Sequence, residues 1–267
     1  MGQSSAAAFA KAHTEGRAAF VGYLPAGFPT YGGCLEAMRA LVDGGVDLVE
    51  VGLPYSDPVI DGVTIQAATE RALRQGTRIA DVLRTVEATV AMGVPAVVMS
   101  YWNPVLAYGV ERFAADLEAV GCSGLITPDL IPDEAADWLQ AAEAHHLDRV
   151  FLVAPSSTQA RIAATVEQCR GWVYAASTMG VTGARDATST AAPELVRRVR
   201  EATALPVGVG LGVSNRDQAA EVASYADGVV VGSALVRCLL DATDEKAGVA
   251  AVGKLATELA EGVRAGR

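Results

Sequence analysis

The chain has 267 residues, 51% of them hydrophobic, and a net charge of -10. This length and apolar content suit one large core, since a single (β/α)8 barrel takes about 250 residues. The acidic balance, without any cluster of basic residues, argues against nucleic acid and anionic membrane surfaces as partners.

The cysteines stand singly, with no C-x-x-C pair, at Cys34, Cys122, Cys169 and Cys238. Single thiols are typical of a reducing compartment, so we expect a cytoplasmic protein with unreactive cysteines. No basic segment followed by an apolar run marks a signal peptide. Residues 88–110 carry no charge and are long enough to span a bilayer. Glycine, proline and asparagine interrupt them, which instead predicts a helix end, a buried strand and a loop.

Strands and helices alternate along the whole chain. Strands are predicted at 18–24, 48–53, 96–101, 124–128, 150–153, 172–177, 206–211 and 228–231. Helices are predicted at 5–15 with Ser4 or Ser5 as cap, at 31–43, at 64–91 with a break at Gln75-Gly76, at 109–120, 132–146, 159–169, 191–203 and 214–223, and from about Ser233. Eight strands, each followed by a helix, predict an α/β protein: a closed (β/α)8 TIM barrel with an additional N-terminal helix, forming one domain over residues 1–267.

A doubly wound open sheet would show the same alternation of strands and helices. That fold usually has fewer strands and a G-x-G-x-x-G fingerprint after the first one. The first loop here, Pro25-Ala-Gly27, has no such fingerprint, and the glycine-rich loops come late in the chain. This placement favours the barrel.

Two carboxylates accompany the second strand. Glu50 interrupts an otherwise apolar strand and points the same way as Leu48 and Gly52, and Asp61 follows in the turn-rich loop beyond. The active site of a barrel lies at the carboxyl ends of its strands, so both acids fall on the working face. They indicate acid/base catalysis. The alternative is a satisfied interior carboxylate and a residue that merely forms a turn.

Glycines mark the last three strand-to-helix loops, as Gly180-Val-Thr-Gly183, Gly210-Leu-Gly212 and Gly232-Ser233. Glycine lets backbone N–H groups approach an anion closely, and Ser233 would begin a helix whose N-terminus favours phosphate. Each glycine pair alone could be only a tight turn. No lysine stands in these loops, and no H-x-H or H-E-x-x-H pattern predicts a metal site. The residues therefore indicate an acid/base enzyme without a metal or cofactor that acts on an organic phosphate.

Five motifs in this order resemble the tryptophan synthase α subunit family and span about residues 18 to 238. They are Leu-Val-Glu50-Val-Gly-Leu-Pro-Tyr-Ser-Asp-Pro-Val-Ile-Asp61-Gly, Met99-Ser-Tyr-Trp-Asn-Pro104, Tyr174-Ala-Ala-Ser-Thr-Met-Gly180-Val-Thr-Gly183, Gly210-Leu-Gly212-Val-Ser and Val-Gly232-Ser233-Ala. The first motif is highly specific, whereas other phosphate-binding barrels share the glycine motifs.

The resemblance implies a retro-aldol cleavage of indole-3-glycerol phosphate to indole and glyceraldehyde 3-phosphate. Glu50 matches the family's general acid/base, Asp61 the carboxylate that binds the indole N–H, and Tyr174 the site tyrosine. The phosphate contacts would be Gly183, Gly212, Gly232 and Ser233. Tyr23, Met99, Tyr101 and Ile126 would line the indole cavity, although they could equally be ordinary barrel filling, and Thr182 would meet Asp61 when the loops close.

The resemblance also implies a partner, the tryptophan synthase β subunit, in a heterotetramer of two α and two β chains. Pyridoxal phosphate belongs to that partner, and this chain itself would hold no cofactor. Asp57, Pro58, Asn103 and Pro104 lie where the family contacts the β subunit. The plain alternative is that they are exposed loop residues.

Three other functions stay open at this point. A related phosphate barrel, such as an isomerase or an epimerase, would share the glycine loops but would not need Glu50 paired with Asp61. A free-standing lyase would keep every catalytic residue and differ mainly in its loops. A non-catalytic scaffold that only activates a β subunit would need neither carboxylate.

Overall fold

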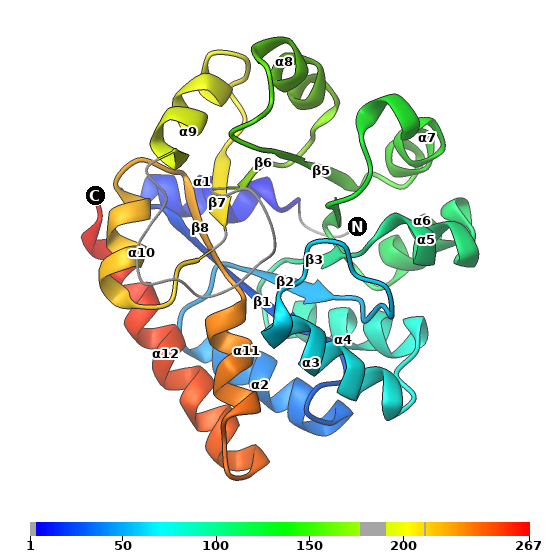
Figure 1. Cartoon of the computed structure of the whole chain (residues 1–267), viewed down its shortest axis with the longest axis vertical. Helices are drawn as coiled ribbons and strands as arrows, with labels where there is room; N and C mark the ends of the chain where they lie inside the picture. The colour runs from blue at the N-terminus through cyan, green and yellow to red at the C-terminus, as the bar shows by residue number, and fades with distance from the viewer. Residues whose placement is uncertain (1–3, 177–190, 211) are drawn as a thin grey trace.

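The computed structural model describes residues 4–176, 191–210 and 212–267, whose parallel strands close into a barrel in the order β1 to β8 (Figure 1). The strands are β1 Ala19–Pro25, β2 Leu48–Gly52, β3 Ala96–Met99, β4 Gly124–Thr127, β5 Asp148–Val153, β6 Val173–Ala176, β7 Val207–Gly210 and β8 Gly228–Val231. The last strand pairs with the first, so the sheet has no free edge. The predicted TIM barrel is confirmed.

The helices are α1 Ala6–Thr14, α2 Tyr31–Asp43, α3 Val63–Arg74, α4 Ile79–Ala91, α5 Trp102–Tyr108, α6 Val110–Ala119, α7 Ala136–Ala144 after the short 3₁₀ helix η1 Pro132–Glu134, α8 Gln159–Gln168, α9 Ala192–Arg200, α10 Arg216–Ala223, α11 Ser233–Leu240 and α12 Glu245–Ala265. They surround the barrel in Figure 1. No helix among the described residues is long and apolar enough to cross a membrane.

One predicted loop is a helix. Asn103 and Pro104 were expected in a loop after the third strand, but they lie in the first turn of α5. That expectation was wrong because proline lacks only an N–H that is unpaired anyway at a helix start, so it does not prevent a helix from beginning there.

Two apolar clusters build the fold. The larger one fills the space between strands and helices, and the smaller one fills the inside of the barrel. The inner cluster includes Leu48, Ile126 and Val150 from three strands, and also Phe9 from α1. Alternation along each strand sends successive side chains to opposite faces. Glu50, two residues after Leu48, therefore shares its direction toward the barrel interior.

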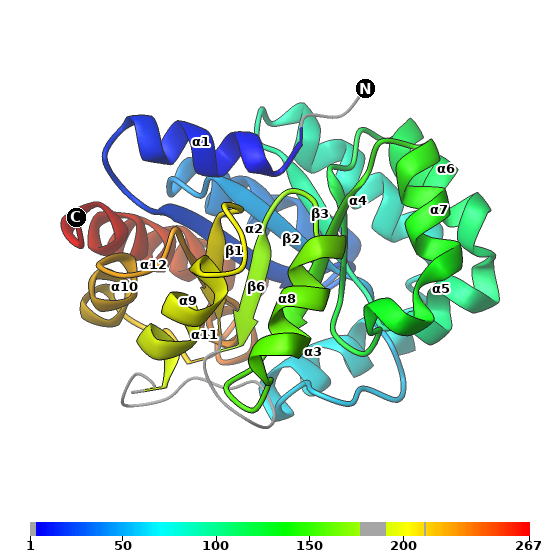
Figure 2. The same ribbon diagram turned by 90° about the horizontal axis from the view of Figure 1, so that it is seen from above.

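Helix α1 covers the end of the barrel where the strands begin, and the strands point away from it (Figure 2). It is fixed by Asp148, whose buried carboxylate accepts hydrogen bonds from the Ser4 hydroxyl at 2.9 Å and from the Ser5 amide and hydroxyl at 2.7 and 2.6 Å. Ser5 precedes the helix, but its side chain makes no capping bond. Of the two caps expected, Ser4 or Ser5, the Ser5 hydroxyl binds Asp148 instead, while the Ser4 hydroxyl accepts a hydrogen bond from the Ala6 amide at 3.3 Å.

Candidate active site

The Glu50 carboxyl group is enclosed at the interior of β2. Only 1% of the residue is exposed, and its Oε1 atom has no hydrogen-bond partner among the described residues. Burial favours the neutral form and raises the pKa of Glu50 to about 8. A buried polar atom without a partner is rare in a folded protein and needs a reason, such as a place kept for a ligand.

Tyr23 interacts electrostatically with both carboxylates. It is paired in register with Glu50 on the neighbouring strand, and its ring lies over Gly52, where an added Cβ would stand 2.3 Å from its hydroxyl oxygen. Burial raises the pKa of Tyr23 most, and the charges of Asp61 and Glu50 raise it further. Both acids thus lie within electrostatic range of this hydroxyl.

Asp61 ends the loop between β2 and α3 and is only 7% exposed. Its side chain is hydrogen-bonded to Tyr101, which lowers its pKa, but burial is the larger effect and raises that pKa. The Tyr101 hydroxyl also accepts a hydrogen bond from the Ile60 amide at 3.0 Å, and Gln66 donates to the Asp61 carbonyl at 2.7 Å. The loop is thus held on both sides of the carboxylate.

Tyr174 closes the site from β6. It is buried, and burial together with the charge of Glu50 raises its pKa. Its hydroxyl lies over Gly210 of β7, where a Cβ would come within 2.1 Å of it. Met99 and Ile126 are register partners on β3 and β4 and form part of the inner cluster. The geometry therefore gathers Glu50, Asp61, Tyr23, Tyr101 and Tyr174 at one end of the barrel.

The glycine-rich end of the site is partly described. Ser233 is buried and begins α11 directly after Gly232, so the first amides of that helix have no intrahelical acceptor. Gly212 after β7 has a φ of +107°, a conformation that side chains rarely adopt. Both features suit an anion. Thr182 and Gly183 lie outside the described residues.

Within the part of the chain that the structure describes, no three histidine, cysteine, aspartate or glutamate side chains are grouped to hold a metal ion. The arrangement offers a carboxyl group with a pKa near neutrality, a second carboxylate held by a tyrosine, and helix amides suited to an anion. These groups can move a proton, stabilise a nearby positive charge and bind a phosphate.

Comparison with known proteins agrees with this geometry. The family model described as "Tryptophan synthase alpha chain" matches residues 9–264. The chain belongs to the tryptophan synthase alpha chain family. It is 62% identical over 257 residues to the tryptophan synthase alpha chain of Acidothermus cellulolyticus, covering 96% of each chain. It is 61% identical over 256 residues to that of Nocardia farcinica, covering 96% of this chain and 94% of that one. A solved structure of Mycobacterium tuberculosis tryptophan synthase superposes with a TM-score of 0.92 at 58% identity, covering 99% of each chain.

The residues that the family resemblance assigns to a partner contact lie beside this site. Asp57 and Asn103 are exposed, and Pro58 and Pro104 are half-buried. The Asn103 amide donates to the Tyr55 hydroxyl at 3.0 Å, which connects α5 to the loop after β2.

Sequence reasoning missed two features of the site. Val59 and Leu106, beside these residues, are large apolar side chains that are 68% and 52% exposed. Trp172 packs against the Tyr174 ring, with ring centroids 5.4 Å apart, and against Phe9 of α1 at the same separation. The period-2 alternation from 172 to 174 could have placed Trp172 under Tyr174, but nothing local indicates its contact with Phe9.

Proposed function

We propose that this chain is the α subunit of tryptophan synthase, a lyase that cleaves indole-3-glycerol phosphate to indole and glyceraldehyde 3-phosphate. The observation that carries the proposal is the enclosed Glu50 carboxyl group, whose Oε1 atom lacks a hydrogen-bond partner among the described residues and whose charge, like that of Asp61, acts on the Tyr23 hydroxyl. Indole is a poor leaving group until its C3 atom is protonated, so the reaction needs an acid that still holds its proton near neutral pH. Burial provides such an acid at Glu50.

In the proposed cycle, protonated Glu50 donates its proton to C3 of the indole ring. Asp61 accepts a hydrogen bond from the ring N–H and stabilises the positive charge that develops on the nitrogen. The hydroxyl on the adjacent side-chain carbon then returns a proton to Glu50. Its O–H electron pair forms the carbonyl of glyceraldehyde 3-phosphate as the C–C bond breaks, and the electrons of that bond restore neutral indole. Glu50 ends the cycle protonated.

The remaining assigned residues position the substrate. We assign Gly183, Gly212, Gly232 and Ser233 to the phosphate, Tyr23, Met99, Tyr101 and Ile126 to the indole cavity, Tyr174 to the reacting carbons, and Thr182 to contact with Asp61. The start of α11 supports the phosphate assignment. The burial of Tyr23, Tyr101 and Ile126 supports an apolar cavity for the ring.

Indole would pass to a β subunit, which holds the pyridoxal phosphate and completes L-tryptophan synthesis in an assembly of two α and two β chains in the cytoplasm. Asp57, Pro58, Asn103 and Pro104 would contact that subunit. Exposed Val59 and Leu106 support an apolar contact at this face. The solved relative from Mycobacterium tuberculosis is a tryptophan synthase.

The test is indole release from indole-3-glycerol phosphate, with and without added tryptophan synthase β subunit. We expect slow release that the β subunit strongly stimulates. Glu50→Gln and Asp61→Asn should each lose about 10²-fold or more in turnover, whereas Glu36→Gln, at an exposed position of α2, should not. Fast release without stimulation would identify a free-standing lyase, and near-normal turnover of Glu50→Gln would refute the mechanism.

A further inference from the structure

A cavity of about 600 Å³ opens at the end of the barrel opposite Glu50. It lies between α1, the connection from α9 to β7, the residue before β8 and the last residue of the chain. Its size is within the range of about 300–1,000 Å³ that is typical of small-molecule sites. None of the residues assigned to the reaction lines it.

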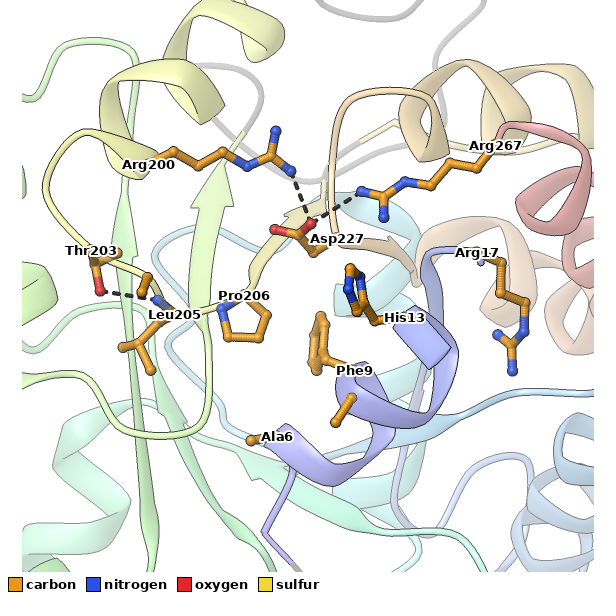
Figure 3. A pocket seen from close by; sticks show the side chains of 12 residues that line it. Ala6, Phe9, His13, Arg17, Arg200, Thr203, Leu205, Pro206, Asp227 and Arg267 are labelled. Atoms are coloured by element: carbon orange, nitrogen blue, oxygen red, sulfur yellow. Dashed lines mark hydrogen bonds and ion pairs between the residues drawn. The ribbon is translucent and has the colours of Figure 1, made fainter. Parts of the chain in front are cut away.

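Two arginines share a single carboxylate in this cavity. The Nη2 atoms of Arg200 and Arg267 lie 2.9 and 3.1 Å from the same Oδ1 atom of Asp227, and Figure 3 shows the carboxylate between the two guanidinium groups. The other oxygen, Oδ2, accepts from the Val207 amide at 3.0 Å. Two guanidinium groups thus meet a single carboxylate at this end of the cavity.

The third arginine of the lining, Arg17, is already paired with carboxylates. It donates two hydrogen bonds to Asp47, at 2.6 and 2.8 Å, and a third to Glu15. Two carboxylates therefore occupy the Arg17 donors, and the guanidinium groups to consider for a ligand are those of Arg200 and Arg267.

Arg200 is the arginine with unused hydrogen-bond donors. Arg267 also donates to the backbone carbonyls of Ala223 and Ala226 at 3.1 and 2.8 Å. The Arg200 side chain, by contrast, makes no hydrogen bond within the described residues except the one to Asp227. A guanidinium has five N–H donors in a planar fork that matches a carboxylate. Arg200 can therefore take a second carboxylate without releasing Asp227.

Apart from His13 and Thr203, the rest of the lining is apolar. Phe9, Leu205 and Pro206 line the cavity, and Figure 3 shows the rings of Phe9 and Pro206 near each other, with the His13 ring between Phe9 and Asp227. A charged fork beside an apolar, ring-bearing wall suits a ligand with one anionic end and a flat apolar body. We propose that this cavity binds a small organic anion, an aromatic carboxylate, through Arg200.

The test is a ligand-observed NMR titration of the full chain with benzoate and, separately, with its neutral isostere benzamide. Benzoate should bind with a dissociation constant of order 1 mM, and benzamide should bind at least about fivefold more weakly. Arg200→Gln should weaken benzoate by about fivefold or more. Arg197→Gln, on the same helix but paired with Glu194 and Glu201 outside the cavity, is the matched control and should bind like the parent chain.

A second variant leaves the charge cluster intact. Ala10 lines the cavity at an exposed position of α1, so Ala10→Phe should fill the space and weaken benzoate without loss of helix. Circular dichroism of each variant checks that it is folded. Binding unchanged in Arg200→Gln and Ala10→Phe would place the anion elsewhere and overturn the proposal, and so would equal binding of benzamide and benzoate.

Discussion

Replacing Glu50 with glutamine should stabilise the protein at neutral pH while it destroys activity. The pKa of Glu50 is about 8 in the folded chain, against an ordinary value of 4.5. Between these two values the folded state binds more protons than the unfolded state, so this group makes the protein less stable as pH rises. Below pH 4.5 it is neutral in both states and the penalty disappears. Glutamine has a similar shape and does not titrate.

The size of the effect follows from the pKa difference. One pH unit inside this window corresponds to 1.36 kcal/mol, so the two units from pH 5 to pH 7 give about 2.7 kcal/mol. For a chain of this size, 1 kcal/mol shifts the melting temperature by roughly 2–4 °C. The gain in melting temperature of Glu50→Gln over the parent chain should therefore be roughly 5–10 °C larger at pH 7 than at pH 5.

Thermal unfolding of both proteins at the two pH values measures this difference, and comparing the two cancels every other titrating group. Glu36→Gln, which removes an exposed carboxylate, controls for the loss of a negative charge and should change the melting temperature little at either pH. A gain that is the same at pH 5 and pH 7 would show that Glu50 does not titrate in this window, and the reasoning from its burial would fail.

Three further outcomes are expected. Gly210→Ala should lower kcat/KM by about 10²-fold, because the new Cβ would lie 2.1 Å from the Tyr174 hydroxyl, whereas Gly32→Ala, whose Cβ would meet nothing closer than 4.0 Å, should be unchanged in the same indole-release assay. Asp148→Asn should lower the free energy of unfolding by roughly 3 kcal/mol and speed proteolysis near the N-terminus, which denaturation and peptide mapping would detect. The pH profile of kcat/KM should fall above about pH 8, where Glu50 loses its proton, and a flat profile there would contradict its role as an acid.

The sequence was sufficient to predict the barrel and the end of the barrel at which its two acids lie. Alternation along a strand fixes the direction of Glu50 from its neighbours alone, and a barrel places the residues that follow each strand at one end. The N-terminal anchor needed the structure, since Asp148 is 143 positions from Ser5 and no local pattern joins them. The same holds for the cavity at Arg200 and Asp227, whose parts come from separate segments of the chain.

The attachment of α1 also constrains the order in which the protein can be built. Phe9 packs on Trp172 and faces Gly228, and Ser5 binds Asp148, so the contacts that hold α1 beyond its neighbour β1 come from much later in the chain. At about 5–20 residues per second, a ribosome needs roughly 7 to 30 seconds to add the 143 positions that separate Ser5 from its anchor. During that interval α1 is synthesised but lacks its anchor at Asp148. Helix α1 can therefore dock on Asp148 only once β5 has been synthesised.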